Sequence, residues 1–160
     1  MQNTIKIRPA TEKDFIGVTK LYRESFKLHH KAHPRIFNPA PQFPLSRGSF
    51  LNILEDENEL MMVAEKEKVI VGFINASIEK DGRDRWQKAY HRVSIDDICV
   101  NQPERRSGIG RQLMQSIEKW AVKKGIKELT VITFNFNKIA TKFYANLGYV
   151  PITTRVSKYL

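Results

Sequence analysis

The segment from Ile95 to Leu113 constrains the fold more than any other part of the chain. It reads IDDICVNQPERRSGIGRQL: an apolar strand runs into a turn and then directly into the start of a helix. The first N–H groups of a helix have no partner within it, and Gly108 and Gly110 let an anion approach that backbone without a Cβ in the way. Positive charge surrounds the same place, on Arg105, Arg106 and Arg111. The pattern predicts a phosphate-binding turn at the carboxyl end of a parallel strand.

This turn differs from two common nucleotide-binding loops. It has no Gly-Lys-Ser/Thr sequence, as a Walker loop would, and it lacks the third glycine of the dinucleotide fingerprint. The alternative interpretation is structural: two glycines ease a turn, and the arginines around it are simply solvated.

Hydrophobic periodicity predicts the elements that precede this segment. Thr4–Arg8 alternates as a strand, and Thr11 with Asp14 forms a variant capping box ahead of a first helix. Ser46 is placed to cap a short second helix. Three antiparallel strands then follow, with charged turns between them at Lys66–Lys68 and Lys80–Arg85: Leu60–Glu65, Val69–Ile78 and Gln87–Val100.

The period changes in the last third of the chain. Apolar residues recur at helical spacing over Gly110–Lys124, which Gly125 closes, and again over Asn137–Leu147, which Gly148 ends. Lys127–Thr133 and Tyr149–Val156 are predicted as strands. The fold class is therefore α/β (α+β) with a mixed sheet, in which an antiparallel meander precedes a parallel strand–helix–strand crossover.

Composition excludes several classes of protein. The 160 residues suit a single domain over 1–160, and one cysteine, Cys99, excludes an intramolecular disulfide and a thiolate zinc site. No apolar run is long enough to cross a membrane, and Met1–Arg8 is strand-like rather than a signal peptide, so we expect a reduced, cytoplasmic location. The net charge of +10 favours anionic partners. The alternative is that it only reflects a basic surface exposed to solvent.

The stretch from His29 to Pro44 is predicted as a long loop. It holds four of the seven prolines, which break regular elements, and three of the four histidines. His29 and His33 have the spacing of a metal-ligand pair, but no carboxylate lies among them and the H-E-x-x-H pattern is missing. We therefore expect a lid on the substrate side and no metal site.

Taken together, these features resemble the GNAT superfamily of acyl-CoA-dependent N-acetyltransferases. The family's central motif, Arg/Gln-x-x-Gly-x-Gly/Ala, is satisfied by Arg105 to Gly110, between the expected strand and helix. The opening segment Ile7–Asp14 and the closing segment Asn137–Tyr149 also look like the family's first and last blocks. The resemblance covers nearly the whole chain except the stretch from His29 to Pro44.

The resemblance implies acetyl-CoA as co-substrate and residues that bind it. The backbone of Ile98, Cys99 and Val100 would pair with the pantetheine arm, as a neighbouring strand would. Asn137 and Ala140 would touch that arm further along. The pyrophosphate would lie on the turn and on the N–H groups that follow it, formed by Arg105, Arg106, Ser107, Gly108, Ile109, Gly110 and Arg111.

Tyr144 matches the family's general acid, which protonates the departing CoA thiolate. A phenol has a pKa of about 10, close to that of the leaving thiolate, so it can donate its proton late in the transition state. The alternative is a core aromatic on a helical stripe, with its hydroxyl at the rim.

Asp96 and Asp97 are candidates for the base that takes a proton from the amine, since an alkylammonium has a pKa near about 10. Adjacent residues of a strand point to opposite faces, so we expect only one of them to face the cleft. The stretch IDDICV resembles the strand of polyamine acetyltransferases, whose first acidic position serves the amine, and this favours Asp96. Solvated strand acids beside basic neighbours are the alternative for both.

The sequence thus predicts an N-acetyltransferase in which a primary amine attacks acetyl-CoA directly in a ternary complex. The acceptor would be a small molecule or a peptide: polyamines, aminoglycosides and acidic protein N-termini all stay open, and a homodimer is expected. A basic nucleic-acid-binding module and a non-catalytic CoA sensor on the same fold are the alternatives.

Overall fold

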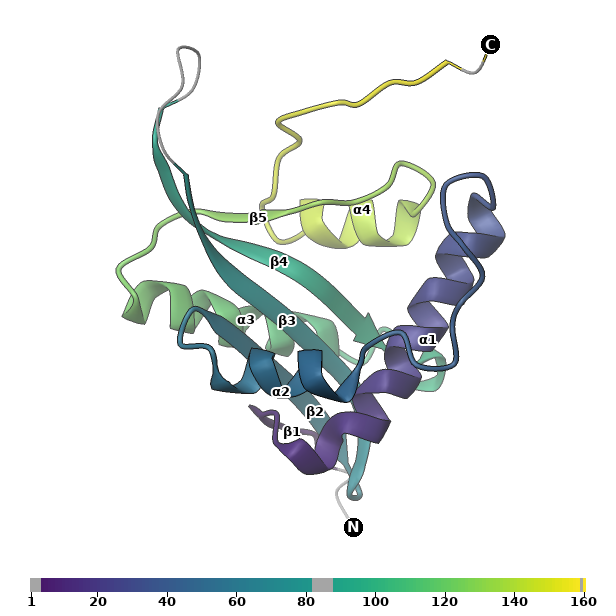
Figure 1. Cartoon of the computed structure of the whole chain (residues 1–160). Helices are drawn as coiled ribbons and strands as arrows, with labels where there is room; N and C mark the ends of the chain where they lie inside the picture. The colour runs from purple at the N-terminus through teal and green to yellow at the C-terminus, as the bar shows by residue number, and fades with distance from the viewer. Residues whose placement is uncertain (1–3, 82–87, 159) are drawn as a thin grey trace.

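The structure, a computed structural model, describes residues 4–81, 88–158 and 160. Its centre is a five-stranded sheet in the order β1-β2-β3-β4-β5 (Figure 1). The first four strands are antiparallel, whereas β5 runs parallel to β4. Their bounds are Lys6–Pro9 for β1, Glu59–Lys66 for β2, Val69–Asp81 for β3, Tyr90–Val100 for β4 and Leu129–Val131 for β5.

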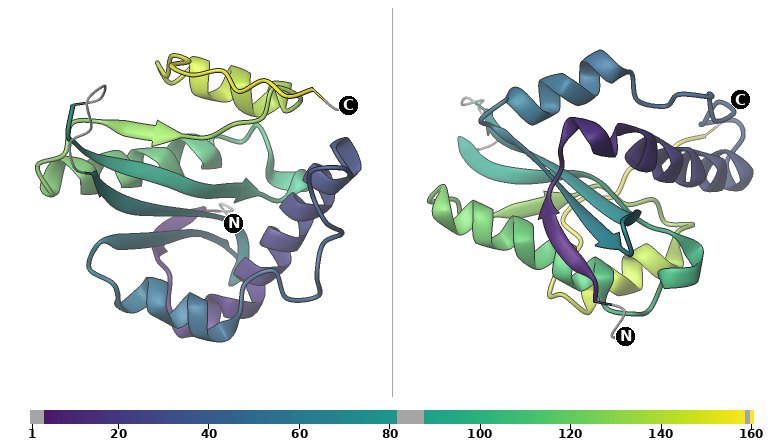
Figure 2. Two further views of the ribbon diagram at one scale, coloured as in Figure 1. Left: turned by 45° about the horizontal axis from the view of Figure 1, so that its top comes forward. Right: turned by 90° about the horizontal axis from the view of Figure 1, so that it is seen from below.

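Helices cover both faces of this sheet, as the right-hand view of Figure 2 shows. Helix α1 (Phe15–Ala32) and helix α2 (Arg47–Glu55) pack on one face, around Val18, Phe50 and Phe73. Helix α3 (Ile109–Lys123) and helix α4 (Lys138–Ala145) pack on the other, where Leu113 and Ile117 are fully buried. Short 3₁₀ turns over Glu12–Asp14 and Gln102–Glu104 precede α1 and α3.

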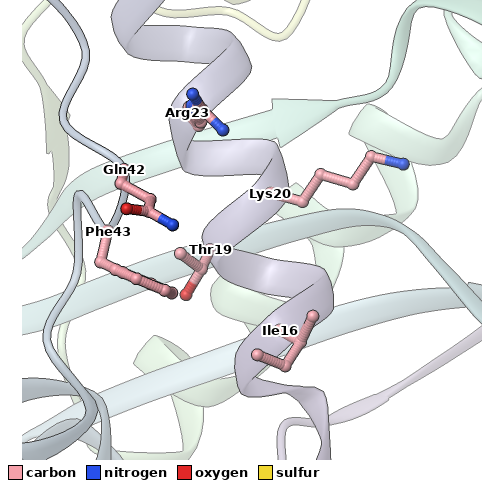
Figure 3. A pocket seen from close by; sticks show the side chains of 6 residues that line it. All are labelled: Ile16, Thr19, Lys20, Arg23, Gln42 and Phe43. Atoms are coloured by element: carbon pink, nitrogen blue, oxygen red, sulfur yellow. The ribbon is translucent and has the colours of Figure 1, made fainter.

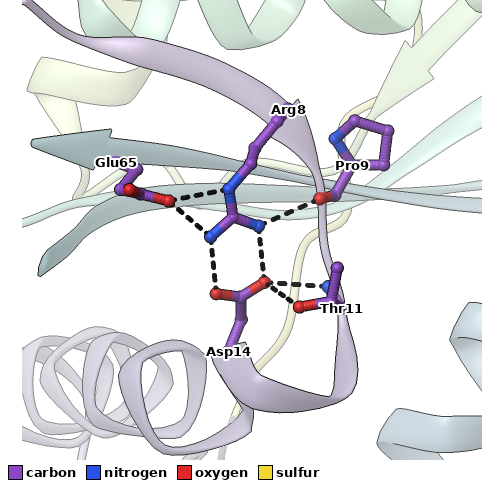
Figure 4. A network of polar contacts seen from close by, with 5 residues as sticks. All are labelled: Arg8, Pro9, Thr11, Asp14 and Glu65. Carbon is purple, nitrogen blue, oxygen red and sulfur yellow. Dashed lines mark hydrogen bonds and ion pairs between the residues drawn. The ribbon is translucent and has the colours of Figure 1, made fainter. Parts of the chain in front are cut away.

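The capping box predicted at Thr11 and Asp14 is present, and it belongs to a larger network (Figure 4). The Asp14 carboxylate accepts two hydrogen bonds from Arg8, at 2.7 and 2.8 Å, and one from the Thr11 backbone N–H at 2.8 Å. Arg8 also donates to Glu65 on β2. The network lowers the pKa of Asp14, first through the Arg8 hydrogen bonds, and it fixes the start of α1 against the edge of the sheet.

The other local predictions are largely confirmed. Ser46 caps α2 by accepting from the Ser49 N–H at 3.0 Å, and Gly125 follows α3 with a φ of +74°. The turn after β2 falls at Glu67 and Lys68, both at positive φ. The turn predicted over Lys80–Arg85 lies mostly outside the described residues. No helix among the described residues is long and apolar enough to cross a membrane.

One prediction about the end of the chain is wrong, and another is confirmed over a shorter range. Tyr149–Val156 forms no strand, because no strand among the described residues lies beside it: Tyr149 is half-buried against Tyr144, and residues 150–156 are exposed. The strand predicted over Lys127–Thr133 is reduced to the three residues of β5, since the chain pairs with β4 only there. The predicted loop from His29 is also shorter, because α1 continues through Ala32.

Candidate active site

The edge of β4 that faces β5 is open over its last residues. β5 pairs with β4 only at Val93, Ser94 and Ile95, and the chain then turns away. In the described part of the chain, Ile98, Cys99 and Val100 therefore have no strand on this side. Arg105 Nε donates to the Val100 carbonyl at 3.0 Å. An open edge of this kind presents backbone donors and acceptors to an extended ligand arm.

The turn after β4 ends in a helix whose first N–H groups are free of intrahelical partners. Arg106 and Gly108 adopt left-handed backbone conformations, with φ of +64° and +88°. Gly108 is the N-cap of α3 and offers no side-chain cap, and the first helical bond runs from Gln112 N to Gly108 O at 3.1 Å. The N–H groups of Ile109, Gly110 and Arg111 thus remain available to an anion.

The structure gives each of the two glycines a physical reason of its own, beside the predicted access for an anion. A Cβ on Gly108 would meet no protein atom within 4 Å, and the left-handed backbone, with a φ of +88°, favours glycine there. A Cβ on Gly110 would come within 3.2 Å of the Phe143 ring. Gly110 therefore lets α4, the helix that carries Tyr144, approach α3 closely.

Helix α4 holds three of the predicted residues. Asn137 is the N-cap of α4, and its side-chain oxygen accepts a hydrogen bond from the Ala140 N–H at 3.1 Å. Tyr144 is buried, 7% exposed, and its ring packs against Phe143 and Tyr149. Burial, then Tyr149 and Asp97, raise the pKa of the Tyr144 phenol, so it stays protonated at neutral pH.

The prediction that Asp96 and Asp97 point to opposite faces is wrong. Asn75 of β3 pairs with Asp97, whereas Ala76 pairs with Ile95, so Asp96 is an extra residue in a β-bulge. Asp97 accepts a hydrogen bond from Tyr22 of α1, and Asp96 accepts one from Ser77 Oγ at 3.2 Å. Ala76 packs on the α3 side, so its neighbours on β3, Asn75 and Ser77, lie on the opposite face, which α1 and α2 cover. Because Asp97 pairs with Asn75 and Asp96 contacts Ser77, both acids lie on that face.

Asp97 is the more strongly perturbed of the two acids. The Tyr22 hydroxyl donates to Asp97 Oδ2 at 2.9 Å, and the Tyr22 ring lies 4.4 Å from that of Phe73, centroid to centroid. The pKa of Asp97 is raised to about 6. Burial is the main cause, and the charge of Asp96 adds to it, whereas the Tyr22 hydrogen bond and the charge of His29 lower the pKa. Sequence reasoning missed Tyr22, since nothing local to either residue signals a pair separated by 75 positions.

Four side chains on this face form a group that we call the acidic floor: Glu59, Asn75, Asp96 and Asp97. Although Asp96 as a residue is exposed, partial desolvation of its carboxylate raises its pKa, and so does the charge of Glu79. Burial raises the pKa of Glu59, whereas a hydrogen bond with Asn75 lowers it. Asn75 is 5% exposed, and its Oδ1 has no donor among the described residues. A ligand that donates a hydrogen bond to Asn75 Oδ1 would therefore be stabilised here, and a cationic donor would also be attracted by the three carboxylates.

An aromatic cluster joins the end of α1 to the segment between β5 and α4. His29 is its centre, with ring centroids 5.1 Å from Phe37, 5.7 Å from Phe134 and 5.5 Å from Phe136. His29 Nδ1 lies 2.8 Å from the Ser25 carbonyl, which holds the ring in place. Among the described residues, no group of His, Cys, Asp and Glu could hold a metal ion.

Two other features carry less chemistry. Cys99 is buried with its Sγ 3.5 Å from the Leu21 carbonyl, and burial raises the pKa of its thiol to about 12, so it acts as a small apolar residue. An open hollow of about 210 Å³ lies between α1 and the loop at Gln42 and Phe43 (Figure 3). None of its lining residues belongs to β4, α3 or α4, so we place the site elsewhere.

Comparison with known proteins identifies the family. Residues 17–149 match the model of the Acetyltransferase (GNAT) family. Aminoglycoside N(6')-acetyltransferase type 1 of Salmonella typhimurium is 29% identical over 107 residues, which cover 67% of this chain and 72% of that protein. L-ornithine N5-acetyltransferase NATA1 of Arabidopsis thaliana is 37% identical over 54 residues, or 34% of this chain and 24% of that protein.

Solved structures agree in fold. A mutant of the BH1408 protein from Bacillus halodurans superposes with a TM-score of 0.91 at 23% identity, over 97% of this chain and 99% of that one. Aminoglycoside N-acetyltransferase AAC(6')-Iy in complex with CoA superposes with a TM-score of 0.72 at 22% identity, over 97% and 98%. With the open strand edge, the glycine turn and the family match agreeing, the chain belongs to the GNAT family of acetyltransferases.

Proposed function

We propose that the protein transfers the acetyl group of acetyl-CoA to a primary amine of a small polycationic acceptor, by direct attack in a ternary complex. The observation that carries the proposal is a meeting of three parts at one strand. An acid with a pKa near neutrality, Asp97, lies on β4 at the face covered by α1, and a buried phenol, Tyr144, lies on α4 at the opposite face. Both belong to the region where β4 has an open edge beside the free N-terminus of α3.

The binding of acetyl-CoA would use two sets of backbone groups. The N–H groups of Ile109, Gly110 and Arg111 fit a pyrophosphate, and Arg105 and Arg106 add positive charge beside them. The open edge at Ile98–Val100 fits the amide-bearing pantetheine arm. Asn137 and Ala140, at the start of α4, would lie further along that arm. When bound, acetyl-CoA supplies the acyl group and the thiolate leaving group.

Proton transfer would involve two side chains. The Asp97 carboxylate, with its pKa of about 6, is ionised at neutral pH and takes a proton from the acceptor ammonium, directly or through one water. The freed amine attacks the acetyl carbonyl. As the C–S bond breaks, Tyr144 donates its phenolic proton to the departing sulfur, and the proton that the nitrogen loses on becoming an amide returns to the Tyr144 phenolate through water, so that the products are the amide and CoA thiol. We assign the base to Asp97 rather than Asp96 because the Tyr22 hydroxyl holds the Asp97 carboxylate at 2.9 Å and because Asp97 is the more buried of the two acids.

The acidic floor favours a polycationic acceptor. The chain as a whole carries a net charge of +10 and repels polycations, but this face gathers three carboxylates and an unpaired amide oxygen. One ammonium at Asp97 and a second at Glu59 and Asn75 would satisfy these groups. Polyamines and aminoglycosides both fit this chemistry, whereas the acidic N-terminus of a protein does not.

Two alternatives predict different behaviour. A CoA sensor on this fold would bind acetyl-CoA without transferring the acetyl group. A nucleic-acid-binding module would bind DNA or RNA with an affinity that falls steeply with salt, because such binding depends on phosphate contacts. A cytoplasmic location and a homodimer are part of our proposal.

The experiment is a thermal shift followed by an acetyl-transfer assay. Acetyl-CoA at about 100 times its Kd should stabilise the fold by about 2.7 kcal/mol, whereas ATP, the phosphate control, should not. Release of CoA thiol should then follow addition of spermidine or an aminoglycoside, but not of an acidic peptide. Binding without release with any amine would favour the sensor. No shift with acetyl-CoA would overturn the proposal.

A further inference from the structure

The outer face of α1 carries a row of positive charges that we call the cationic stripe. It consists of Lys20, Arg23, Lys27 and Lys31, which follow one another at intervals of three or four residues and therefore lie on one face of the helix. All of them are exposed, and none forms an ion pair with another described residue. At a rise of about 1.5 Å per residue, the stripe is about 16 Å long.

The helix itself does little to balance this charge. Glu24 is the only acidic residue between Phe15 and Ala32, and it has no ion pair among the described residues. Like charges three or four positions apart repel one another, so the stripe weakens the helix that carries it. The helix dipole favours a cation in the last turn, at Lys31, but not one in the first half, at Lys20. An anionic partner along the stripe would remove this repulsion.

The first part of the stripe borders the hollow between α1 and the loop at Gln42 and Phe43 (Figure 3). Two of its lining side chains, Ile16 and Phe43, are apolar yet 68% and 57% exposed. A third, Thr19, is only 5% exposed, and its Oγ1 has no hydrogen-bond partner among the described residues. A bound chain that placed a polar group here would satisfy this hydroxyl.

The size of the hollow indicates what enters it. Its volume of about 210 Å³ is below the range of about 300–1,000 Å³ that is typical of sites for whole small ligands. It therefore fits a single apolar side chain of a larger partner. The stripe continues beyond the hollow along the helix, so the same partner would place its negative charges there.

We infer that the cationic stripe and this hollow bind an acidic protein segment, whose carboxylates pair with the stripe and one of whose apolar side chains enters the hollow. A nucleic acid would pair with the cations too, but it has no aliphatic side chain to cover Ile16. A second copy of this chain is disfavoured, because a two-fold contact would place one stripe against the other. None of these residues belongs to β4, α3 or α4, so the inference does not depend on the proposed function.

The first test measures peptide binding to the full chain by fluorescence anisotropy at low salt. One labelled peptide has a leucine between two runs of glutamate, and its control has serine in place of the leucine. The leucine peptide should bind about tenfold more tightly, because its apolar side chain is buried in the hollow. Phe43→Ser should remove this preference while it leaves the affinity for the serine peptide unchanged, since it alters the hollow and not the stripe.

A second test separates the stripe from the overall charge of the protein. Lys20→Glu/Lys27→Glu should weaken binding of the leucine peptide by at least about tenfold, because it opposes the peptide's carboxylates. Lys119→Glu/Lys123→Glu is the matched control: it makes the same change of charge at exposed positions of α3, and it should bind as the unchanged protein does. Thermal unfolding shows whether both variants are folded.

Three results would overturn the inference. The first is the absence of peptide binding at low salt, and the second is an equal loss of affinity in the two charge variants. The third is tighter binding of single-stranded RNA or of phosphatidylserine vesicles than of the leucine peptide, lost in Lys20→Glu/Lys27→Glu. That result would assign the stripe to a nucleic acid or to a membrane surface instead.

Discussion

The hydrogen bond from Tyr22 to Asp97 should set the pH at which the enzyme becomes active. Asp97 accepts a proton only in its ionised form, so kcat/KM should fall as the pH decreases through its pKa of about 6. The Tyr22 hydroxyl, 2.9 Å away, stabilises that ionised form and lowers the pKa. In Tyr22→Phe the ring still packs on Phe73 while the hydrogen bond is lost. The acid limb should therefore move to higher pH.

The size of this movement follows from the hydrogen bond. A hydrogen bond to a charged group contributes about 1.5–3 kcal/mol, and one pKa unit corresponds to about 1.36 kcal/mol. The midpoint of the limb should therefore move up by about one to two pH units. Tyr22 is 6% exposed, so water replaces its hydroxyl poorly and most of the effect should persist. Well above the new midpoint, kcat/KM should return to the value of the unchanged enzyme.

The assay is the pH profile of kcat/KM for CoA release with a polyamine acceptor. Tyr90→Phe is the control, since it removes a phenol hydroxyl at the far end of β4, and its profile should match that of the unchanged enzyme. A merely structural role for Tyr22 would lower the rate equally at every pH. If the midpoint of the acid limb of the kcat/KM profile is the same in Tyr22→Phe as in the unchanged enzyme, Asp97 is not the base whose ionisation this limb measures.

Three further substitutions probe the site and its support. Tyr144→Phe should lower kcat by about a hundredfold or more while the affinity for CoA, measured by calorimetry, is unchanged. Asp97→Asn should abolish activity. It should also raise the free energy of unfolding at pH 7, measured in urea, by at most about 3 kcal/mol, because the raised pKa of Asp97 means that its ionisation opposes folding. This gain should vanish near pH 4, where Asp97 is protonated. Asp14→Asn should lower the free energy of unfolding at pH 7 by about 3 kcal/mol, since it breaks a buried ion pair with Arg8. Because the pKa of Asp14 is lowered in the folded state, the ion pair stabilises the fold at pH values above the ordinary pKa of an aspartate. The difference in stability between the variant and the unchanged protein should therefore shrink as the pH falls below about 4.

Local signals in the sequence predicted most of the elements that position the site. The glycine turn before α3, the Ser46 cap and the capping box at Thr11 depend on residues a few positions apart, and the structure has all three. Each works through backbone geometry or a short side chain that bonds its own neighbourhood. Such signals can be read without knowledge of the rest of the fold.

Non-local pairing is where sequence reasoning failed. Tyr149–Val156 has the pattern of a strand, but a strand forms only where a partner edge is available, and no pattern says which chain supplies that edge. The bulge at Asp96 likewise has no glycine to mark it, and it arises only from the register of β3 against β4. Because one extra residue reverses the alternation, a rule that holds along a regular strand gave the wrong face for one of the two acids.

That bulge explains how one strand can serve two ligands of opposite charge. At its carboxyl end β4 leads into Arg105, Arg106 and the free N–H groups of α3, where an anion is favoured. A few residues earlier, a regular strand would present one carboxylate to the α1 and α2 face, whereas the bulged strand presents both Asp96 and Asp97. A chain with a net charge of +10 thus keeps the acidic floor, where we propose that the acceptor binds, within a few residues of its cationic turn. The attacking amine and the acyl donor would meet between the acidic floor and the cationic turn, where β5 leaves the edge of β4 open.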